Sequence, residues 1–530
     1  MASRTGRDPG RGTRDAGRSG VQTGSVTPVD SSLTTPESSP TAASAAPAAP
    51  AGAAAGRRPG FGTLLAVDLW ERFSFFGMAA ILVLYLTASE ARGGLGMAPP
   101  TATAVFAAYM SLSFMAGLPG GWLADRVLGA RRAVLLGGAL ITCGHAVLAV
   151  PVPGTLYAGL LLVVAGTGLV KPAMAAMVAG VSGDGAGRRE AAFSLFYMCI
   201  QVSALVAPVV TGLLAERVAW HLGFAAAAFG MTAGLVQFAL GRRRYGDVGA
   251  RPSRPVPHSE AAAMLRRAAW ATGAVAALLV APASLGLLPL PAVLAVLGLT
   301  TVTLPFWYLR SLCRAGAPGE AHRRRLAGFT ALMASSAAFW MIFAQSGSVL
   351  SLFAERHTDR DLLGFEVPAS WFQSVHPLFV LLVAPLFARL WLRAGPRADV
   401  PVKFAGALIT AGLSFVLMAV AARLAEHGPV GPYWLLLVYL LYSCGEIALA
   451  PAGLALAATV APPGSTSRLL AVNGLFGAVG VVVGGQLFRL TAVLPLATYF
   501  LLLGASVLAV GTAVALGTPR LRRLLGATHE

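Results

Sequence analysis

Apolar stretches of about 20 residues or more recur along this chain from Phe61 almost to its C-terminus. A helix of that length crosses a hydrocarbon core of roughly 30 Å with all its backbone hydrogen bonds satisfied internally. Apolar residues make up 56% of the chain and charged residues 12%, which leaves too little polar surface to solvate a globular protein of this size. The pattern predicts an all-α membrane protein.

Fourteen spanning helices are expected from the apolar pattern. Their approximate ranges are 61–88, 102–124, 132–151, 154–181, 191–214, 219–240, 264–285, 287–310, 327–354, 368–392, 403–424, 431–460, 467–490 and 493–517. An even number places both termini on one side. Thirty-two of the 40 Lys and Arg residues fall on that side and six on the other, which indicates the cytoplasmic side. We expect a multi-pass protein of the cell (inner or plasma) membrane with both termini cytoplasmic.

Arginine-rich flanks bracket the two stretches at 264–285 and 287–310. Residues 241–326 are therefore interpreted as a linker that carries two accessory transmembrane helices. Removing them leaves a six-helix bundle at 61–240 and another at 327–517. Two similar halves with a substrate site between them are typical of secondary transporters.

Both ends of the chain are expected to lie in the cytoplasm. Residues 1–58 are rich in Ala, Pro, Ser, Thr and Gly and contain few large apolar side chains, so they are predicted to be a disordered tail. They contain no apolar run strong enough for a secretory signal. Residues 518–530 form a short second tail.

Several classes of function lack a sequence signal. The four cysteines have no metal or redox spacing, and the chain has no nucleophile elbow, no HExxH motif and no phosphate-binding glycine loop. We expect no enzymatic activity, no cofactor and no metal. The net charge of +18 lies in the loops, so a nucleic-acid partner is not expected either.

Five charged residues fall inside predicted spans: Asp68, Glu71, Arg72, Lys171 and Glu446. A charge at the centre of a spanning helix costs about 2.5–3.5 kcal/mol, so each one is a candidate functional residue. The spacing of the first three puts Glu71 and Arg72 beside Asp68 on one helix face. Lys171 is one of only two lysines, and a buried lysine changes charge more readily than an arginine. One alternative is a purely structural Glu71–Arg72 pair. The other places Asp68 and Lys171 at the membrane interface, where the lysine side chain can snorkel.

The run from Asp68 to Gly77, DLWERFSFFG, resembles the ExxERFxYYG signature of the proton-dependent oligopeptide transporters within the major facilitator superfamily. Further resemblances follow in the order of the chain. They are Gly120 to Arg126 with Gly129 and Arg131-Arg132, Gly168 to Lys171-Pro172, Phe193-Ser194 with Phe196-Tyr197-Met198, Phe339-Trp340 to Gln345, Trp371 to Ser374, and Gly445-Glu446 with Pro451 to Leu454. The resemblance covers about residues 61–517.

This resemblance implies a major facilitator fold with 12 core transmembrane helices in two six-helix halves plus two inserted helices. It also implies proton-coupled import of di- or tripeptides by alternating access. In that family, residues equivalent to Asp68, Glu71, Arg72 and Lys171 take part in proton coupling. The equivalent of Glu446 receives the peptide amino terminus, and Lys171 also matches a lysine near the peptide carboxylate.

The loop between the second and third helices carries a further charge group by the same resemblance. In major facilitators, a charge network on the inner face takes part in gating. The matching residues here are Asp125, Arg126, Arg131 and Arg132.

Other positions depart from the family pattern. An arginine that clamps the peptide carboxylate is Ala79 here, and a proposed proton-site glutamate is Ala344. Two pocket tyrosines are Phe76 and Phe114. Loss of a guanidinium weakens recognition of a free carboxylate, and loss of two hydroxyls favours a larger or more apolar ligand.

Three more expected substrate-binding positions differ from the family pattern. Gln201 and His376 are at positions where the family has asparagine, and Asn473 is at a position where the family has tryptophan. His376 is a candidate proton relay because an imidazole changes charge between pH 5 and 8. The alternative is a neutral histidine that hydrogen-bonds as the asparagine would. His145 has no counterpart in the family motifs and is expected to be a packed core residue.

We therefore expect a proton-coupled symporter for di- or tripeptides or peptide-like molecules. Its expected partners are protons, the small peptide-like substrate and the lipid bilayer, and we expect a functional monomer. One alternative is a proton-coupled exporter of an amphipathic metabolite or drug. The other is a membrane sensor that binds ligand without transporting it.

Overall fold

The computed structural model describes residues 60–152, 154–182, 186–275, 289–316, 319–461 and 466–526 of the 530-residue chain. Thirteen helices in these residues are long and apolar enough to cross a membrane, and they correspond to thirteen of the fourteen predicted spans. Most boundaries agree to within a few residues, but the helix predicted from 327 begins at Glu320 and the last helix, predicted to end at 517, continues to Leu525, into the predicted tail. The remaining span is the one at 264–285. Its second half, from residue 276, and the tail predicted at 1–58 lie outside the described residues.

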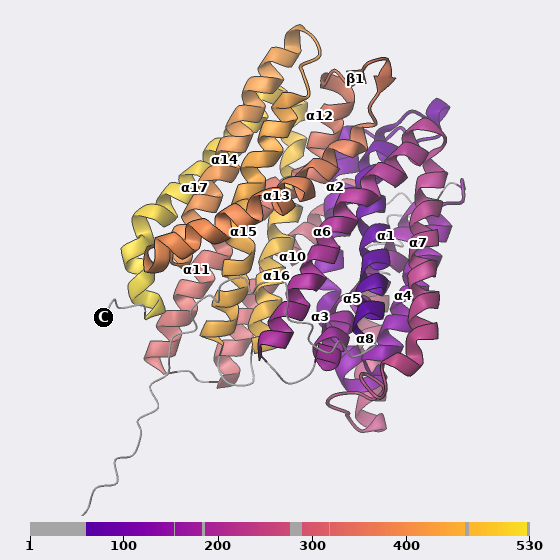
Figure 1. The fold of residues 1–530 in the computed structure, drawn as a ribbon, viewed down its shortest axis with the longest axis vertical. Helices are drawn as coiled ribbons and strands as arrows, with labels where there is room; N and C mark the ends of the chain where they lie inside the picture. The colour runs from indigo at the N-terminus through magenta and orange to yellow at the C-terminus, as the bar shows by residue number, and fades with distance from the viewer. Residues whose placement is uncertain are drawn as a thin grey trace, which may run out of the picture. The chain divides into compact units, whose positions relative to one another are not determined.

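The first six spans are built from the N-terminal elements of Figure 1. These are α1 (Phe61–Thr87), η1 (Glu90–Arg92), α2 (Pro99–Met115), α3 (Gly117–Leu123), η2 (Ala124–Leu128), α4 (Ala130–Leu148), α5 (Thr155–Ser182), α6 (Ala186–Arg217), α7 (Trp220–Leu240) and η3 (Gly241–Arg244). The second span starts at two prolines, whose fixed φ suits a first helical turn. It ends in a π-helical turn, η2, closed by Gly129 at a φ of 79°.

The remaining elements form the linker helices and the last six spans. They are α8 (His258–Val275), α10 (Leu290–Gly316), α11 (Glu320–Phe343), η5 (Ala344–Gly347), α12 (Val349–His357), η6 (Ala369–Trp371), α13 (Phe372–Ala394), η7 (Gly395–Arg397), α14 (Val400–Leu424), η8 (Ala425–His427), α15 (Tyr433–Val460), α16 (Thr466–Leu487), η9 (Phe488–Ala492) and α17 (Leu496–Leu525). The span predicted at 327–354 is thus two helices, α11 and α12, joined by the 3-10 turn η5. The side chain of Asp399 caps α14 by accepting a hydrogen bond of 3.3 Å from the Val402 N–H.

A small antiparallel hairpin connects α12 to α13. Its strands are β1 (Asp361–Leu362) and β2 (Phe365–Glu366). The two turn residues, Leu363 and Gly364, both have positive φ, at 57° and 84°, as a tight hairpin turn requires. We call the helix ends beside this hairpin the hairpin end. The opposite ends, next to η2 and η3, are the linker end.

The helices pack into two groups that meet along their sides. In the first group α1 packs on α6 and α7, and α4 packs on α5; in the second group α14 packs on α15 and α17, and α11 packs on α16. Figure 1 shows the first group in indigo and magenta and the second in colours from salmon pink (α11) through orange to yellow. The groups are joined where α2 packs on α16 and α6 packs on α13, and α10 lies against α16 and α2. These groups correspond to the bundles predicted at 61–240 and 327–517.

Glycine allows the closest approach within the first half. Gly120 of α3 lies so near the backbone of Gly168 in α5 that a Cβ at position 120 would overlap the carbonyl of Gly168. This contact holds the end of the second span against the helix that carries Lys171.

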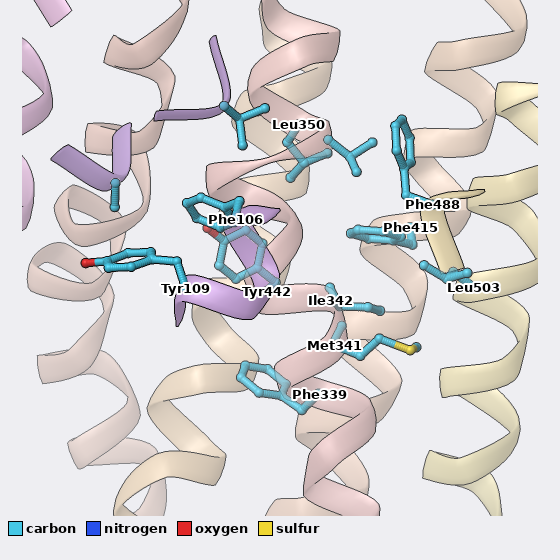
Figure 2. Packing of buried hydrophobic residues seen from close by; sticks show 14 of the residues in the cluster. Phe106, Tyr109, Phe339, Met341, Ile342, Leu350, Phe415, Tyr442, Phe488 and Leu503 are labelled. Carbon is cyan, nitrogen blue, oxygen red and sulfur yellow. The ribbon is translucent and has the colours of Figure 1, made fainter. Parts of the chain in front are cut away.

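Buried apolar side chains form two large clusters. The larger one, part of which is shown in Figure 2, includes Phe339, Ile342, Phe415 and Leu503 of the second half and also runs through the hairpin end of the first half. The smaller one, which begins at Phe61, belongs to the linker end of the first half alone. The two halves therefore share a core at the hairpin end, whereas the first half has a core of its own at the linker end.

Candidate functional site

Three charged side chains lie together on α1, at the spacing that the sequence predicts. The Arg72 Nε atom lies 3.5 Å from Asp68 Oδ1 and 3.3 Å from Glu71 Oε2. Asp68 and Glu71 are buried, at 0% and 1% exposure. One guanidinium thus lies within 3.5 Å of two carboxyl groups inside the span.

Lys171 of α5 is the second cation of this region. Its Nζ atom lies 4.0 Å from the ring centroid of Phe75 and 5.7 Å from that of Phe114. Asp68 and Glu71 lie within its electrostatic reach, although among the described residues no carboxylate forms a direct ion pair with it. The aromatic faces therefore stabilise the ammonium group in place of a bound anion.

A cavity of about 80 Å³ lies between the two halves. It is well below the roughly 300 Å³ of an ordinary small-molecule pocket, so the structure represents a tightly closed conformation of this site. Its lining comes from α1, α2, α6, α11, η5, α13, α15 and α16, namely Phe75, Phe76, Ala79, Phe106, Met110, Phe114, Ala204, Pro208, Trp340, Phe343, Ala344, Ser346, Gly347, Gln373, His376, Pro377, Tyr442 and Val481. The four departures Phe76, Ala79, Phe114 and Ala344 thus all line it.

His376 of α13 contacts Glu446 of α15 directly. The distance from His376 Nε2 to Glu446 Oε2 is 2.5 Å. The imidazole also stacks on Tyr442, with ring centroids 4.9 Å apart and an angle of 21° between the planes. The edge-to-face ring of Phe343 lies 5.4 Å away. His376 lines the cavity, and Glu446 lies behind it.

Four predicted substrate-binding residues lie outside the cavity lining in this conformation, namely Lys171 and Glu446, described above, and Gln201 and Asn473. Gln201 of α6 is buried, at 4% exposure, and hydrogen-bonds to Tyr197. Asn473 of α16 lies against Gly453 of α15. His145 is fully buried in α4, which confirms the prediction of a packed residue.

At the hairpin end, polar contacts join the two halves. The Glu216 carboxylate of α6 accepts hydrogen bonds from the backbone N–H groups of Ala369 and Ser370, at 2.7 and 2.9 Å. Trp371 Nε1 donates to the Val209 carbonyl at 3.0 Å. Two ion pairs, Arg92–Glu355 at 3.6 Å and Arg217–Glu366 at 3.7 Å, complete the closure.

At the linker end, the loop between α2 and α4 holds the chain that follows α7. Arg131 donates to the carbonyls of Gly246 and Val248, at 2.5 and 3.1 Å, and its guanidinium lies 6.0 Å from the Tyr245 ring. Burial raises the pKa of Tyr245 to about 12, so its ring stays neutral. Asp125 accepts a hydrogen bond of 3.2 Å from Ser253.

The other two members of the predicted gating group make weaker contacts. The backbone carbonyl of Arg126 accepts a bond of 3.4 Å from the Val256 N–H, and the Arg132 side chain is exposed. The linker thus lies across the loop that the sequence assigns to gating.

Comparison with known proteins gives the family. The sequence profile of the POT family matches residues 131–502. The uncharacterized transporter YclF of Bacillus subtilis (strain 168) is 34% identical over 477 residues, which are 89% of this chain and 95% of YclF. The chain belongs to the POT family. This POT-family protein is also 30% identical to the di-/tripeptide transporter of Lactococcus lactis subsp. cremoris, over 89% of this chain and 97% of that one.

Solved structures agree with this assignment. The crystal structure of peptide transporter POT in complex with sulfate superposes on this POT-family protein with a TM-score of 0.84 and 35% identity. The match covers 88% of this chain and 96% of that one. The major facilitator fold that the sequence motifs imply is thereby confirmed.

Sequence reasoning missed one residue of this POT-family protein, Glu216. It lies just beyond the span predicted at 191–214, where a single acidic residue gives no signal. Its function depends on a contact with residues about 150 positions later. A carboxylate at the end of one helix that meets the start of another is recognisable only in three dimensions.

Proposed function

We propose that this protein is a proton-coupled symporter that imports di- or tripeptides, or peptide-like molecules, by alternating access. The observation that carries the proposal is the charge group beside the central cavity: Asp68, Glu71 and Arg72 on α1 with Lys171 facing them from α5. Buried titratable groups next to a cavity at the interface of two halves suit coupled transport. The relative from Lactococcus, named as a di-/tripeptide transporter, supports the substrate class.

The roles of the residues form part of the proposal. Asp68, Glu71, Arg72 and Lys171 couple proton movement to transport. Substrate meets the cavity residues Phe76, Phe114 and His376, and it reaches Lys171, Gln201, Glu446 and Asn473 when the cavity widens. Asp125, Arg126, Arg131 and Arg132 control the linker end.

The shared core supports a conformation that is closed at the hairpin end. Polar contacts and one continuous apolar cluster join the halves there, while the first half keeps a separate core at the linker end. Opening at the linker end therefore disrupts less packing than opening at the hairpin end. In our proposal the linker end faces the cytoplasm, with both termini on that side of the cell membrane, and the transporting unit is a monomer.

The proposal also assigns a role to each segment of the chain. Bundles at 61–240 and 327–517 perform the transport movement, and 241–326 is the linker with two accessory helices. Of the two, α10 packs on both halves, through α2 and α16. Tails at 1–58 and 518–530 lie in the cytoplasm.

The test is uptake of labelled dialanine into liposomes with an imposed inward proton gradient. Wild type is compared with Glu446→Gln and Lys171→Ala, and Lys403→Ala serves as the matched control. Lys403 is the other lysine and lies against Trp391 at the start of α14, away from the cavity. We expect accumulation in wild type and in the control, and its loss in the other two variants. Folded wild-type protein that accumulates neither dialanine nor N-acetyl-dialanine would overturn the proposal.

A second candidate, export of an amphipathic compound, is favoured by the apolar lining of the cavity. Phe76, Ala79, Phe114 and Ala344 each lack the polar group that the family pattern has there. If the protein is an exporter, liposomes that contain it and are preloaded with an apolar cation should lose that cation when a proton gradient directed into the liposomes is imposed. A sensor would bind its ligand without any flux.

A further inference from the structure

The central cavity has an unusual charge distribution for a peptide site. Among the described residues that line it, none is Asp, Glu, Lys or Arg, and His376 is the one side chain that can carry positive charge. Glu446, the carboxylate that would receive an ammonium group, does not line the cavity, and His376, which does, lies 2.5 Å from it. The imidazole is therefore the member of this pair that faces the cavity.

Aromatic side chains flank the contact between His376 and Glu446. His376 Nε2 and Glu446 Oε2 lie 2.5 Å apart without the geometry of a hydrogen bond, and neither atom has another hydrogen-bond partner in the described part of the chain. Tyr442 stacks on the imidazole, and Phe343 packs against its edge. The Ser443 hydroxyl, one helical turn from Tyr439, lies 3.5 Å from the His376 carbonyl. The aromatic rings restrict the imidazole to one orientation, with Nε2 towards the carboxylate.

Glu446 therefore already has a partner before any substrate arrives. A substrate ammonium group must displace the imidazole or remain without an anion in an apolar cavity, where it loses hydration without compensation. We propose that His376 occupies the ammonium subsite of Glu446, and that this transporter prefers peptide-like ligands without a free amino group, such as N-acylated dipeptides. The inference rests on the proposed function and specifies its substrate class.

The opposite side of the site fits the same ligand. Lys171 places an ammonium group behind Phe75 and Phe114, which both line the cavity, so a single substrate carboxylate still has a cation to approach. An acyl group in place of the ammonium would meet the rings of Phe343 and Trp340. The cavity thus combines one anion-binding end with one apolar end.

Other titratable groups near α13 do not supply a substitute anion. Tyr442 and Glu446 come from α15, and Tyr197 of α6 lies within electrostatic reach of Glu446. Glu216 of α6 is engaged by the backbone N–H groups of η6. Asp68 and Glu71 of α1 are both within ion-pair distance of Arg72. Within the described residues, Glu446 is therefore the acid left for an amino group in the cavity, and His376 lies against it.

The test is calorimetric binding of dialanine and N-acetyl-dialanine to the purified full-length protein. We expect wild type to bind the acetylated peptide roughly tenfold or more tightly than the free one. His376→Asn should raise the affinity for dialanine by a similar factor and leave the acetylated peptide within about threefold of wild type. Adding Glu446→Gln to that variant should abolish the gain. His427→Asn, an exposed histidine of η8, is the matched control and should change neither affinity.

Two results would overturn the inference. One is a wild-type preference for dialanine over its acetylated form. The other is a His376→Asn variant, shown to be folded by its thermal transition, in which dialanine gains no affinity. Liposome uptake separates this inference from the proposed function. If His376→Asn changes the preference between the two peptides but no peptide is taken up, the role of His376 is supported and transport is contradicted. If peptide is taken up but His376→Asn does not change the preference, transport is supported and the role of His376 is contradicted.

Discussion

The carboxylate of Glu216 in α6 accepts a hydrogen bond of 2.9 Å from the backbone N–H of Ser370 in η6. A second bond, from Ala369, makes this side chain a cap for the start of the span that contains α13. The cap comes from the other half of the protein. Its negative charge also meets the positive end of the helix dipole, which adds to the attraction.

Glu216→Ala should weaken the closure at the hairpin end. Two buried N–H groups lose their acceptor, which costs about 1–3 kcal/mol in the closed state. The measurement is labelling of Ala204→Cys, a cavity position, by an impermeant thiol reagent added from the hairpin side. It needs a background without the four native cysteines. We expect labelling to become faster by roughly five- to a hundredfold.

Glu366→Ala is the control for this prediction. Glu366 also contacts the first half, through Arg217, but its side chain is 56% exposed. Exposed ion pairs contribute about 0–1 kcal/mol, so labelling should change little. Equal acceleration in both variants would show that any loss of negative charge at this end has the same effect, and the capping role of Glu216 would be wrong.

Arg72→Ala should abolish proton-driven uptake and destabilise the protein. It removes the one cation within ion-pair distance of Asp68 and Glu71 among the described residues. Leaving buried charge without its partner costs about 3–5 kcal/mol of folding free energy. The measurement is the thermal unfolding midpoint in detergent together with uptake. Arg92→Ala, whose side chain is 64% exposed, should shift the midpoint far less.

The contact between Lys171 and Phe75 should be measurable as a coupling energy. The ammonium group lies 4.0 Å from the ring centroid in a desolvated site, where a cation–π contact contributes about 2 kcal/mol. A double-mutant cycle with Phe75→Leu and Lys171→Met, read from unfolding free energies, isolates this term. Strict additivity would contradict the proposal that the ring stabilises the ammonium group.

Arg131→Ala should release the linker from the loop that precedes α4. The side chain donates to two linker carbonyls, at Gly246 and Val248. Without it, trypsin should cleave faster after Arg251 and Arg254, as followed by gel electrophoresis of protein in nanodiscs. Arg132→Ala is the neighbouring control, since that side chain is exposed, and it should leave the cleavage rate unchanged.

The spans were predictable because a hydrocarbon core imposes a length and a composition on each helix. The interruptions within spans were not. The turn at Ala344–Gly347 depends on how closely Gly347 approaches Phe106 of α2, and residues so far apart in sequence carry no local signal of their contact. The π-helical turn at Ala124–Leu128 likewise lies where the loop packs against other elements.

In the site, too, some contacts could be predicted from the sequence and others could not. The four-residue spacing of Asp68 and Arg72 specifies one helix face, so their contact could be predicted from the sequence. His376 and Glu446 were each predicted to be pocket residues from their positions in the family motifs, and of the two His376 lines the cavity. Their direct contact could not be predicted, because it depends on the packing of α13 against α15 and on the rotamer that Tyr442 and Phe343 impose.

The larger apolar cluster has a consequence for how the chain is assembled. Because it runs from the second half into the hairpin end of the first, each half made alone would expose a strip of aromatic and aliphatic side chains that normally faces the other half. A gene divided between α8 and α10 should therefore yield functional protein only when both fragments are synthesised together in one membrane. Fragments made separately should be degraded or aggregate.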